Sequence, residues 1–450
     1  MRSCRTMTKR TFKVKASGLD DFGRGIYKDK NQTIFIPDLL PGEEAEIETE
    51  YRYGKLSDVK VKKRLKTSPD RQIPPCPYYP SCGGCQLLHL NYQYQLIYKR
   101  EKVKGLLHKF AHLDFPVSDT VPCVPHYNFR NKVQKPTRKI KGKVELGFYK
   151  TNTHDFIPIK KCLMETELSQ RISDAVKELL NKYHYDTYDE DKGTGYIRHV
   201  LIKTSLHYEE ALVTIVTTNS ELKGRTNFAK DLMSKVKEVK GVVFNVNPRH
   251  TNVILGEKTI PIYGYTHIKD KIFDNDFLIS TKSFFQTNSY QIENLYRLGI
   301  EGAQLKPTDV VLDAYCGTGT IGISASKYCK QVIGVELEKE AVKDAIRNAR
   351  INDIENIKFY CADCTDYMLK SQTDFDVIFL DPPRKGSTPE FLNAVNKLEP
   401  RRVVYISCEP NTLARDLNIL LKKYKVENVT PVDMFPNTCS VETVVILSKK

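Results

Sequence analysis

Two apolar runs in the C-terminal half of the chain end in residues that could do chemistry. One ends at Asp381 and the other at Ser407-Cys408. A cysteine at the end of an apolar run more often fills a core than reacts. Here the polar, turn-forming residues 409–411 follow it. We therefore expect Cys408 at the mouth of a site, where a thiolate with a lowered pKa could act as a nucleophile.

A third candidate is Glu442, an isolated acid that opens the last apolar run of the chain. An apolar setting would raise the pKa of its carboxyl toward neutrality, the range in which a carboxylate serves well as a general base. An ordinary acid at a strand edge explains the same pattern equally well. The sequence alone leaves both interpretations open.

A glycine-containing turn lies upstream of these residues. An apolar run ends at Asp313 and leads through Gly317 and Gly319 into a helical segment, and a second run ends at Glu336 about 20 residues later. The glycines permit a tight turn and a close approach of backbone to ligand, and Glu336 could accept hydrogen bonds from a ribose. A third run leads to Asp363, which could meet an adenine edge. This pattern favours a nucleotide-like cofactor. A dinucleotide is disfavoured because the third glycine is missing, and the glycines could instead serve the turn alone.

The elements around these residues alternate between short apolar runs and helical stretches. Such runs are typical of parallel strands buried on both faces, in a doubly wound α/β domain. Ligands of these sheets lie beyond the carboxyl ends of the strands, where the candidate residues stand. We expect this domain at residues 276–450, with strands at 310–313, 332–336, 357–360, 377–381 and 403–407.

A cluster of cysteines follows the pattern Cys76-x5-Cys82-x2-Cys85, with Cys162 as the best-placed fourth ligand. Four thiolates suit a structural zinc ion or a [4Fe–4S] cluster, and the spacing does not decide between them. Three unlinked thiols are a further possibility. A second pair, Cys361-x2-Cys364, is not expected to bind metal because Cys361 belongs to an apolar strand.

The N-terminal part of the chain has a different character. Short alternating runs with glycine and proline between them predict a small β-barrel at residues 8–67, a common platform for oligonucleotides. Residues 68–275 read as a mixed, β-rich domain that carries the cysteine cluster. A helix at 93–111 inside this range could pack on the C-terminal domain.

The whole-chain composition favours a polyanionic partner. The 450 residues carry a net charge of +15, and seven Lys or Arg lie between residues 130 and 143 without an acid. A second basic run, 60–66, makes a binding surface more plausible than a merely solvated charge run. No stretch approaches the ~18 apolar residues of a membrane span, and the N-terminus lacks the apolar run of a secretory signal. We therefore expect a cytoplasmic protein without a disulfide framework.

The motifs together resemble the RNA 5-methyluridine methyltransferase family, over nearly the whole chain. They read Ser283-Phe-Phe-Gln286, Asp313-Ala-Tyr315-Cys-Gly-Thr-Gly-Thr320, Asp381-Pro-Pro-Arg-Lys-Gly, Ser407-Cys408-Glu-Pro and Val441-Glu442-Thr. The resemblance implies S-adenosylmethionine as cofactor, with Cys408 as nucleophile and Glu442 as base. It also implies that six residues line the cofactor and target-base pocket: Gln286, Tyr315, Thr320, Glu336, Asp363 and Asp381. Some relatives carry Asn where this chain has Thr320.

The resemblance extends to the other two regions. The N-terminal barrel resembles a TRAM domain, and related enzymes carry a [4Fe–4S] cluster on the cysteine pattern of Cys76, Cys82, Cys85 and Cys162. Both features are typical of members that act on 23S ribosomal RNA, which is the expected partner of a chain that we expect to be a monomer. A thiolate added at carbon 6 of uracil makes carbon 5 nucleophilic, which explains why the family needs a cysteine.

Four other functions fit parts of the pattern. A transfer-RNA 5-methyluridine enzyme would use the same chemistry. An RNA 5-methylcytidine enzyme would carry a cysteine beside the proline of the fourth-strand motif, where this chain has Asp381-Pro-Pro. An amino-group methyltransferase usually has an aromatic residue where Arg384 stands. A non-catalytic RNA-binding or ribosome assembly factor would fit the charge but leave Cys408 and Glu442 without a role.

Overall fold

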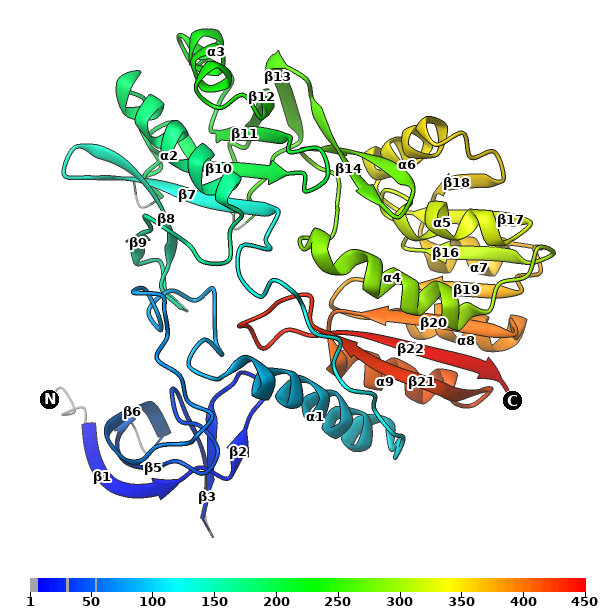
Figure 1. The fold of residues 1–450 in the computed structure, drawn as a ribbon, viewed down its shortest axis with the longest axis horizontal. Helices are drawn as coiled ribbons and strands as arrows, with labels where there is room; N and C mark the ends of the chain where they lie inside the picture. The colour runs from blue at the N-terminus through cyan, green and yellow to red at the C-terminus, as the bar shows by residue number, and fades with distance from the viewer. Residues whose placement is uncertain (1–6, 30–31, 53–54, 152, 191, 252) are drawn as a thin grey trace, which may run out of the picture.

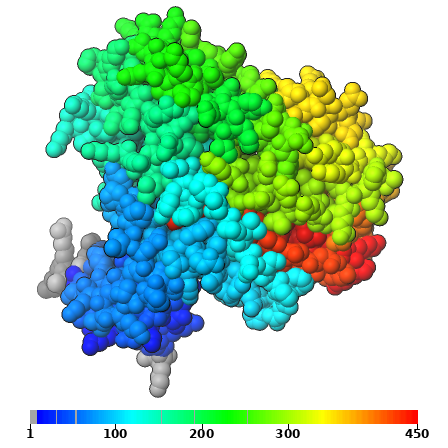
Figure 2. Space-filling model, in the orientation of Figure 1, coloured from blue at the N-terminus to red at the C-terminus, as the bar shows by residue number. Residues whose placement is uncertain are grey.

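The computed structural model describes the chain except for residues 1–6, 30–31, 53–54, 152, 191 and 252. The described residues form an N-terminal unit, a central unit and a C-terminal α/β unit (Figure 1). The N-terminal unit stands out as a lobe at the lower left of the space-filling view (Figure 2). None of the helices in the described part of the chain has the length and apolarity that crossing a membrane requires.

The C-terminal unit is built on a seven-stranded sheet with the order β18-β17-β16-β19-β20-β22-β21. Strands β16 to β20 are parallel, and β22 runs antiparallel to both of its neighbours. This confirms the doubly wound α/β sheet. Its strands are β16 (Val310–Ala314), β17 (Gln331–Glu336), β18 (Ile357–Cys361), β19 (Val377–Leu380), β20 (Arg402–Ser407), β21 (Tyr424–Val432) and β22 (Glu442–Lys449).

Helices cover both faces of this sheet because successive strand residues point to opposite sides. Within β16, for example, Val311 belongs to one buried layer and Leu312 to the other. The helices of the first layer are α4 (Ser289–Ala303), α5 (Thr320–Ala325), which runs into the 3-10 turn η1 (Ser326–Tyr328), and α6 (Lys339–Ile351). Those of the second are α1 (Tyr92–Ala111), α7 (Cys364–Lys370), α8 (Pro389–Leu398) and α9 (Pro410–Leu420).

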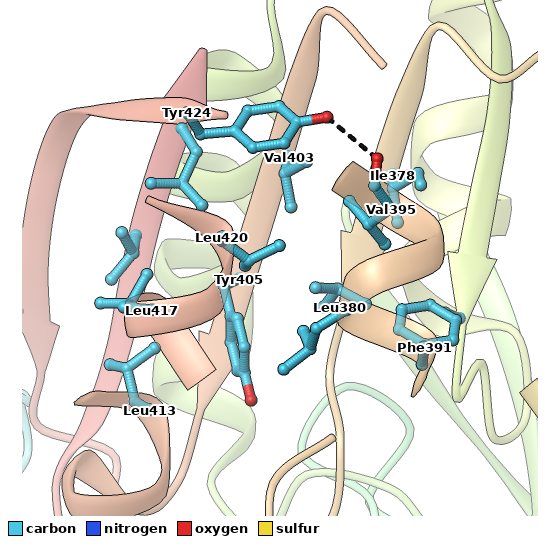
Figure 3. Packing of buried hydrophobic residues seen from close by; sticks show 14 of the residues in the cluster. Ile378, Leu380, Phe391, Val395, Val403, Tyr405, Leu413, Leu417, Leu420 and Tyr424 are labelled. Carbon is cyan, nitrogen blue, oxygen red and sulfur yellow. Dashed lines mark hydrogen bonds between the residues drawn. The ribbon is translucent and has the colours of Figure 1, made fainter. Parts of the chain in front are cut away.

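The second layer of helices packs on the two strands that end at the candidate residues Asp381 and Cys408. Figure 3 shows side chains of α8 and α9 packed on Ile378 and Leu380 of β19 and on Val403 and Tyr405 of β20. These four side chains are fully buried. Burial of each stabilises the fold by roughly 1.5–3 kcal/mol. The ends of β19 and β20 are therefore held in one fixed register.

Two segments from earlier in the sequence also pack on this unit. Helix α1 contributes Val103 and Leu107 to the second layer. The hairpin formed by β14 (His267–Ile272) and β15 (Asn275–Ser280) contributes Ile268 and Phe277 to the first layer. The C-terminal core is therefore assembled from three stretches of the chain.

The central unit is a second seven-stranded sheet with the order β13-β12-β11-β10-β7-β8-β9. Its strands are β7 (Lys132–Ile140), β8 (Lys143–Tyr149), β9 (Phe156–Pro158), β10 (Ile197–Thr204), β11 (Ala211–Thr217), β12 (Val239–Val246) and β13 (Lys258–Gly264). The helices α2 (Glu167–Lys182) and α3 (Arg225–Lys235) pack on it around one hydrophobic core.

The N-terminal unit differs from the closed barrel predicted at residues 8–67. Among the residues described there, the strands form two separate three-stranded sheets, β1-β5-β6 and β2-β3-β4, which pack against each other through a shared core. The strands are β1 (Met7–Lys15), β2 (Gly18–Leu19), β3 (Gly25–Lys28), β4 (Thr33–Ile36), β5 (Glu44–Arg52) and β6 (Lys55–Lys66). Side-chain packing, and not a continuous backbone ladder, joins the two sheets. The strand runs predict a packed β unit but not its closure.

The two basic runs do not form the uniform surfaces that their sequences suggest. In the run at 130–143, Lys135 is buried and pairs with Glu165 at 2.7 Å. In the run at 60–66, Lys62 lies 3.5 Å from Glu48 of β5, the strand between β1 and β6. Part of each run is therefore neutralised within the protein.

Candidate active site

The register of the C-terminal sheet brings three acidic side chains to one edge. Asp381 follows β19, and Cys408 follows its parallel neighbour β20. Strand β22 pairs antiparallel with β20, with Ser407 opposite Thr443. Cys408 is the next residue after Ser407 and Glu442 is the residue before Thr443, so both lie at the end of this ladder, where the charge of Glu442 raises the pKa of the Cys408 thiol.

Burial shifts the pKa values of all three groups upward. It raises the pKa of Asp381 to about 7 and that of Glu442, which is 3% exposed, to about 8, with the charge of Asp381 adding to the effect on Glu442. Burial, together with Glu442 and Asp381, raises the pKa of the half-buried Cys408 thiol to about 12. Three acids this close cannot all be ionised, so this edge holds protons at neutral pH.

Two positive groups oppose this shift at Cys408. The nearby Arg384 guanidinium lowers the pKa of the thiol and that of Glu442. Helix α9 begins at Pro410, with Glu409 as its N-cap, so its positive end lies two residues from Cys408. Both effects favour a thiolate, and a helix N-terminus is a typical setting for reactive cysteines.

The loop that carries Asp381 and Arg384 is fastened to α9. The Thr412 hydroxyl donates to the Arg384 carbonyl at 3.1 Å, and Arg415 donates to the Lys385 carbonyl at 2.9 Å. The amide of Ser387 donates to the Asp416 carboxylate at 2.8 Å. One helix therefore positions both the Cys408 segment and the Asp381 loop.

The glycine-containing turn lies at the same edge, at the end of β16. Gly319 has a φ of 79°, which glycine adopts without strain, and the Gly317 amide donates to the Glu336 carboxylate at 3.1 Å. The second Glu336 oxygen accepts from the Glu338 amide at 2.8 Å. Asp363 accepts from the amides of Thr365 and Asp366 and so caps α7. The turn and both predicted acids are thus fixed before any cofactor binds.

Three further predicted residues line this region. The Tyr315 hydroxyl lies 2.8 Å from the Ser387 hydroxyl and ties the turn to the Asp381 loop. The Thr320 hydroxyl lies 2.8 Å from that of Tyr296. The Gln286 side chain is buried, in a segment that Thr318 holds by donating to the Phe284 carbonyl at 3.1 Å.

Residues of the central unit also hold the segment that carries Gln286, and their role was not predicted from the sequence. The buried Lys203 ammonium donates to the carbonyls of Ser280 and Ser283 at 2.6 and 2.7 Å. The Asn131 amide donates to the Gln286 carbonyl at 2.9 Å. A lysine within the apolar run of β10 was the one visible signal. Its partners lie about 80 residues away, so the sequence could not reveal its role.

The four predicted metal-ligating cysteines come together at a different place. Cys76, Cys82, Cys85 and Cys162 line one cavity of about 460 Å³, together with Arg130 and Glu165. Burial raises the pKa of the Cys85 thiol, and Cys162, Cys82 and Cys76 raise it further. In the residues that the structure describes, no group of three or more His, Cys, Asp or Glu side chains forms a site for a metal ion. The shared cavity is observed, but the predicted metal site is not confirmed.

Comparisons with known proteins agree with this arrangement. A family model described as tRNA (uracil-5-)-methyltransferase matches residues 91–450. An uncharacterized RNA methyltransferase of Clostridium tetani is 38% identical over 447 residues, which cover 97% of this chain and 96% of the relative. Another from Staphylococcus aureus strain MSSA476 is 38% identical over 438 residues, which cover 95% of this chain and 96% of the relative.

A solved structure matches over the same length. The crystal structure of Pyrococcus abyssi tRNA (uracil-54, C5)-methyltransferase in complex with S-adenosyl-L-homocysteine has a TM-score of 0.78 to this chain. The two are 29% identical, and the match covers 97% of this chain and 100% of the other.

Proposed function

The chain belongs to the tRNA (uracil-5-)-methyltransferase family of S-adenosylmethionine-dependent RNA methyltransferases, and on this premise we propose that it methylates carbon 5 of a uridine through a covalent bond to Cys408. One observation carries the proposal. Cys408 directly follows β20 and Glu442 opens its antiparallel partner β22, while Asp381 follows the neighbouring strand β19. A nucleophile and a base at one edge of a rigid sheet are what this chemistry requires.

In the proposed reaction the Cys408 thiolate forms a bond to carbon 6 of the uracil. The electron pair of the C5–C6 double bond moves toward the carbonyl at carbon 4, so carbon 5 becomes nucleophilic. S-adenosylmethionine supplies the methyl group that carbon 5 accepts. The Glu442 carboxylate then removes the proton from carbon 5, and the returning electron pair breaks the bond between Cys408 and carbon 6. The pKa of about 8 suits Glu442 to this step near neutral pH.

The cofactor would lie over the turn that follows β16. Glu336 would accept from the ribose hydroxyls, and Asp363 would face the adenine. Gln286, Tyr315 and Thr320 would line the remainder of the pocket. These assignments are supported by the residues' places at one sheet edge, next to the glycine-containing turn. Asp381 would line the pocket of the target base, where a pKa of about 7 lets it hold or release a proton.

We propose a division into three domains: residues 8–67, a TRAM-like RNA-binding module; residues 68–275, the RNA-binding domain with the cysteine cluster; and residues 276–450, the methyltransferase domain, on which α1 packs. The hydrophobic cores of the N-terminal and central units support this division, while the C-terminal core also takes Ile268 and Ile272 from the segment just before residue 276.

We further propose that the cavity of Cys76, Cys82, Cys85 and Cys162 holds a [4Fe–4S] cluster. A single zinc ion with Zn–S bonds of about 2.3 Å would need the sulfur atoms within about 4 Å of one another. The described side chains show no such convergence, whereas a cavity of about 460 Å³ leaves room for a larger group. The thiols of Cys82, Cys85 and Cys162 have raised pKa values, so they would become thiolates together only around a positive centre.

The proposed substrate is 23S ribosomal RNA, and transfer RNA is the second candidate. The family description and the Pyrococcus abyssi neighbour, which matches along its full length, favour transfer RNA. Mapping 5-methyluridine in both RNAs from cells with and without the protein separates the two. Loss of the modification at a ribosomal site is the expected result. Unchanged 5-methyluridine in both RNAs would contradict the proposed activity.

A further inference from the structure

The N-terminal unit presents two exposed aromatic rings with an arginine between them. Phe22 is 68% exposed and Phe35 is 41% exposed. The guanidinium carbon of Arg24 lies 5.3 Å from the centroid of the Phe22 ring and 4.9 Å from that of the Phe35 ring. We call these three residues the aromatic patch. Exposed rings of this size need an explanation, because the core of the unit is built from other residues.

The aromatic patch is held in place by local structure. Asp20 accepts from the amides of Phe22 and Arg24 at 3.0 and 2.8 Å, and its other oxygen accepts from the Arg24 side chain at 2.8 Å. On β4, Ile34 and Ile36 are buried in the core, so alternation turns Phe35 outward. The rings and the guanidinium are therefore ordered before any partner binds, which reduces the entropy lost on binding.

The segment that bears the aromatic patch also contacts the chain that leads to Glu442. The Lys102 ammonium of α1 donates to the carbonyls of Asp21 and Cys439, each at 3.0 Å. Gly23 lies so close to Cys439 that a side-chain carbon there would be 2.9 Å from the Cys439 sulfur. Cys439 is three residues before Glu442. The patch is thus anchored beside the proposed active site.

The charges of this unit point to its partner. On the β1-β5-β6 sheet, lysines pair with glutamates of β5, as Lys9 does with Glu48 at 3.4 Å and Lys15 with Glu44 at 3.7 Å. That sheet therefore offers paired charges, whereas the aromatic patch adds ring faces and the guanidinium plane of Arg24, which pairs with Asp20 at 2.6 Å and keeps 40% of its side chain exposed. Unpaired nucleotides stack on such groups, and the guanidinium also favours the adjoining phosphates.

We propose that the aromatic patch stacks unpaired bases of the RNA that flank the uridine held at the active site. This inference rests on the proposed function, because it assumes an RNA substrate. It adds that the substrate is single-stranded beside its target. It also assigns Phe22, Arg24 and Phe35 as the side chains that bind those flanking nucleotides.

The first test measures binding of a single-stranded oligouridylate of about 20 nucleotides to the full-length protein. Replacing both rings, Phe22→Ala with Phe35→Ala, is expected to weaken binding by roughly 10-fold or more, with little change in its salt dependence. Phe110→Ala is the matched control. That ring is 40% exposed and lies 4.7 Å from the Lys109 ammonium, but it sits about 12 Å along α1 from Lys102. Equal affinities of the wild type, the double variant and the control would overturn the proposal.

A second measurement does not depend on the stability of the alanine variant. The chain contains no tryptophan, so Phe22→Trp introduces a single indole into the aromatic patch. Oligouridylate should quench the fluorescence of this variant and leave that of Phe110→Trp unchanged. No quenching would overturn the proposal. So would a monomer–dimer equilibrium that the double alanine variant abolishes while RNA affinity stays constant, because the patch would then serve self-association.

The outcomes distinguish this inference from the proposed function. If the wild type transfers no methyl group to any RNA but the patch variants still lose RNA affinity, the proposed function fails and the patch inference stands. If the wild type methylates RNA and the patch variants match it in both Kd and KM for RNA, the patch inference alone fails.

Discussion

The molecule gathers acidic groups at two places, and the two are built differently. Asp381, Cys408 and Glu442 form one group at the edge of a sheet, where backbone ladders fix their positions. The cysteines of the 460 Å³ cavity form the other, on segments outside the helices and strands of the sheets. Burial raises the pKa of thiols in both groups.

The difference lies in the number of thiols and in the groups that surround them. Cys408 has the end of α9 and Arg384 beside it, which favour ionisation of one thiol at a time. At the cysteine cavity, Arg130 lowers the pKa of Cys85 while three neighbouring thiols raise it. The sheet edge thus has one thiol, whose pKa is still raised to about 12 by burial, Glu442 and Asp381. The cysteine cavity suits four thiolates only if a positive centre joins them.

The largest effect is expected from Cys408→Ala. Removing the proposed nucleophile should lower kcat by about 10⁴-fold or more, while binding of S-adenosylmethionine stays within a few-fold of the wild type. Transfer of a labelled methyl group and calorimetric titration measure the two quantities. Cys361→Ala is the control, since this exposed cysteine lies at the end of β18 and should leave activity intact. Substantial turnover by Cys408→Ala would rule out the covalent mechanism.

The next largest effect is expected from Glu442→Gln. Without a base at carbon 5, the bond between Cys408 and carbon 6 cannot break, so kcat should fall by about 10²–10⁴-fold. A protein–RNA adduct should accumulate and be visible on a denaturing gel. The adduct should vanish when Cys408→Ala is added to the same chain. Normal turnover without an adduct would assign proton removal to another group.

The sequence predicted the sheet edge better than it predicted the surroundings. The ends of β19 and β20 follow from apolar runs that stop at polar residues, because a strand buried on both faces needs such a run. Asp381 and Cys408 were therefore visible as candidates from their positions alone. Glu442 was ambiguous, since the antiparallel pairing of its strand β22 with β20 cannot be read from the sequence.

Features that depend on distant partners could not be predicted. Lys135 reads as part of a basic surface until its salt bridge with Glu165 is seen. Lys203 reads as a strand residue until its bonds to the Ser280 and Ser283 carbonyls are seen. The prediction that the N-terminal unit closes into a barrel was wrong for the same reason. Strand runs identify the strands, but side-chain packing between the two sheets decides whether their edges pair.

We expect Cys162→Ser to have a large effect on metal content and only a small effect on catalysis. If the cavity holds an iron–sulfur cluster, anaerobically purified protein should lose most of its iron and show a lower Tm. Cys408 follows a strand of the C-terminal sheet and does not line the cysteine cavity. For Cys162→Ser, kcat should therefore fall by less than about 10-fold, far less than for Cys408→Ala. Cys361→Ser is again the control. Zinc in place of iron, or iron content unchanged in Cys162→Ser, would refute the proposed cluster.

The smallest effect concerns the stability of the sheet edge itself. Glu442 has a folded-state pKa of about 8, whereas an unfolded glutamate titrates near about 4.3. Between these values the unfolded chain has released a proton that the folded chain still holds, so folding becomes less favourable as pH rises. Glu442→Gln removes this penalty. Its Tm should match the wild type near pH 4.5 and exceed it by a few degrees near pH 8.5.

The matched control for this measurement is Glu399→Gln. Hydrogen bonds from Lys423 and Lys449 lower the pKa of Glu399 to about 2, so its ionised form favours folding above the unfolded pKa. Its replacement should therefore give no gain in Tm at either pH. Scanning calorimetry at the two pH values measures all three proteins. A Tm difference for Glu442→Gln that stays constant with pH would mean that the pKa of Glu442 is not raised by folding, and the sheet edge would then lack the carboxyl group with a raised pKa that is proposed as the base.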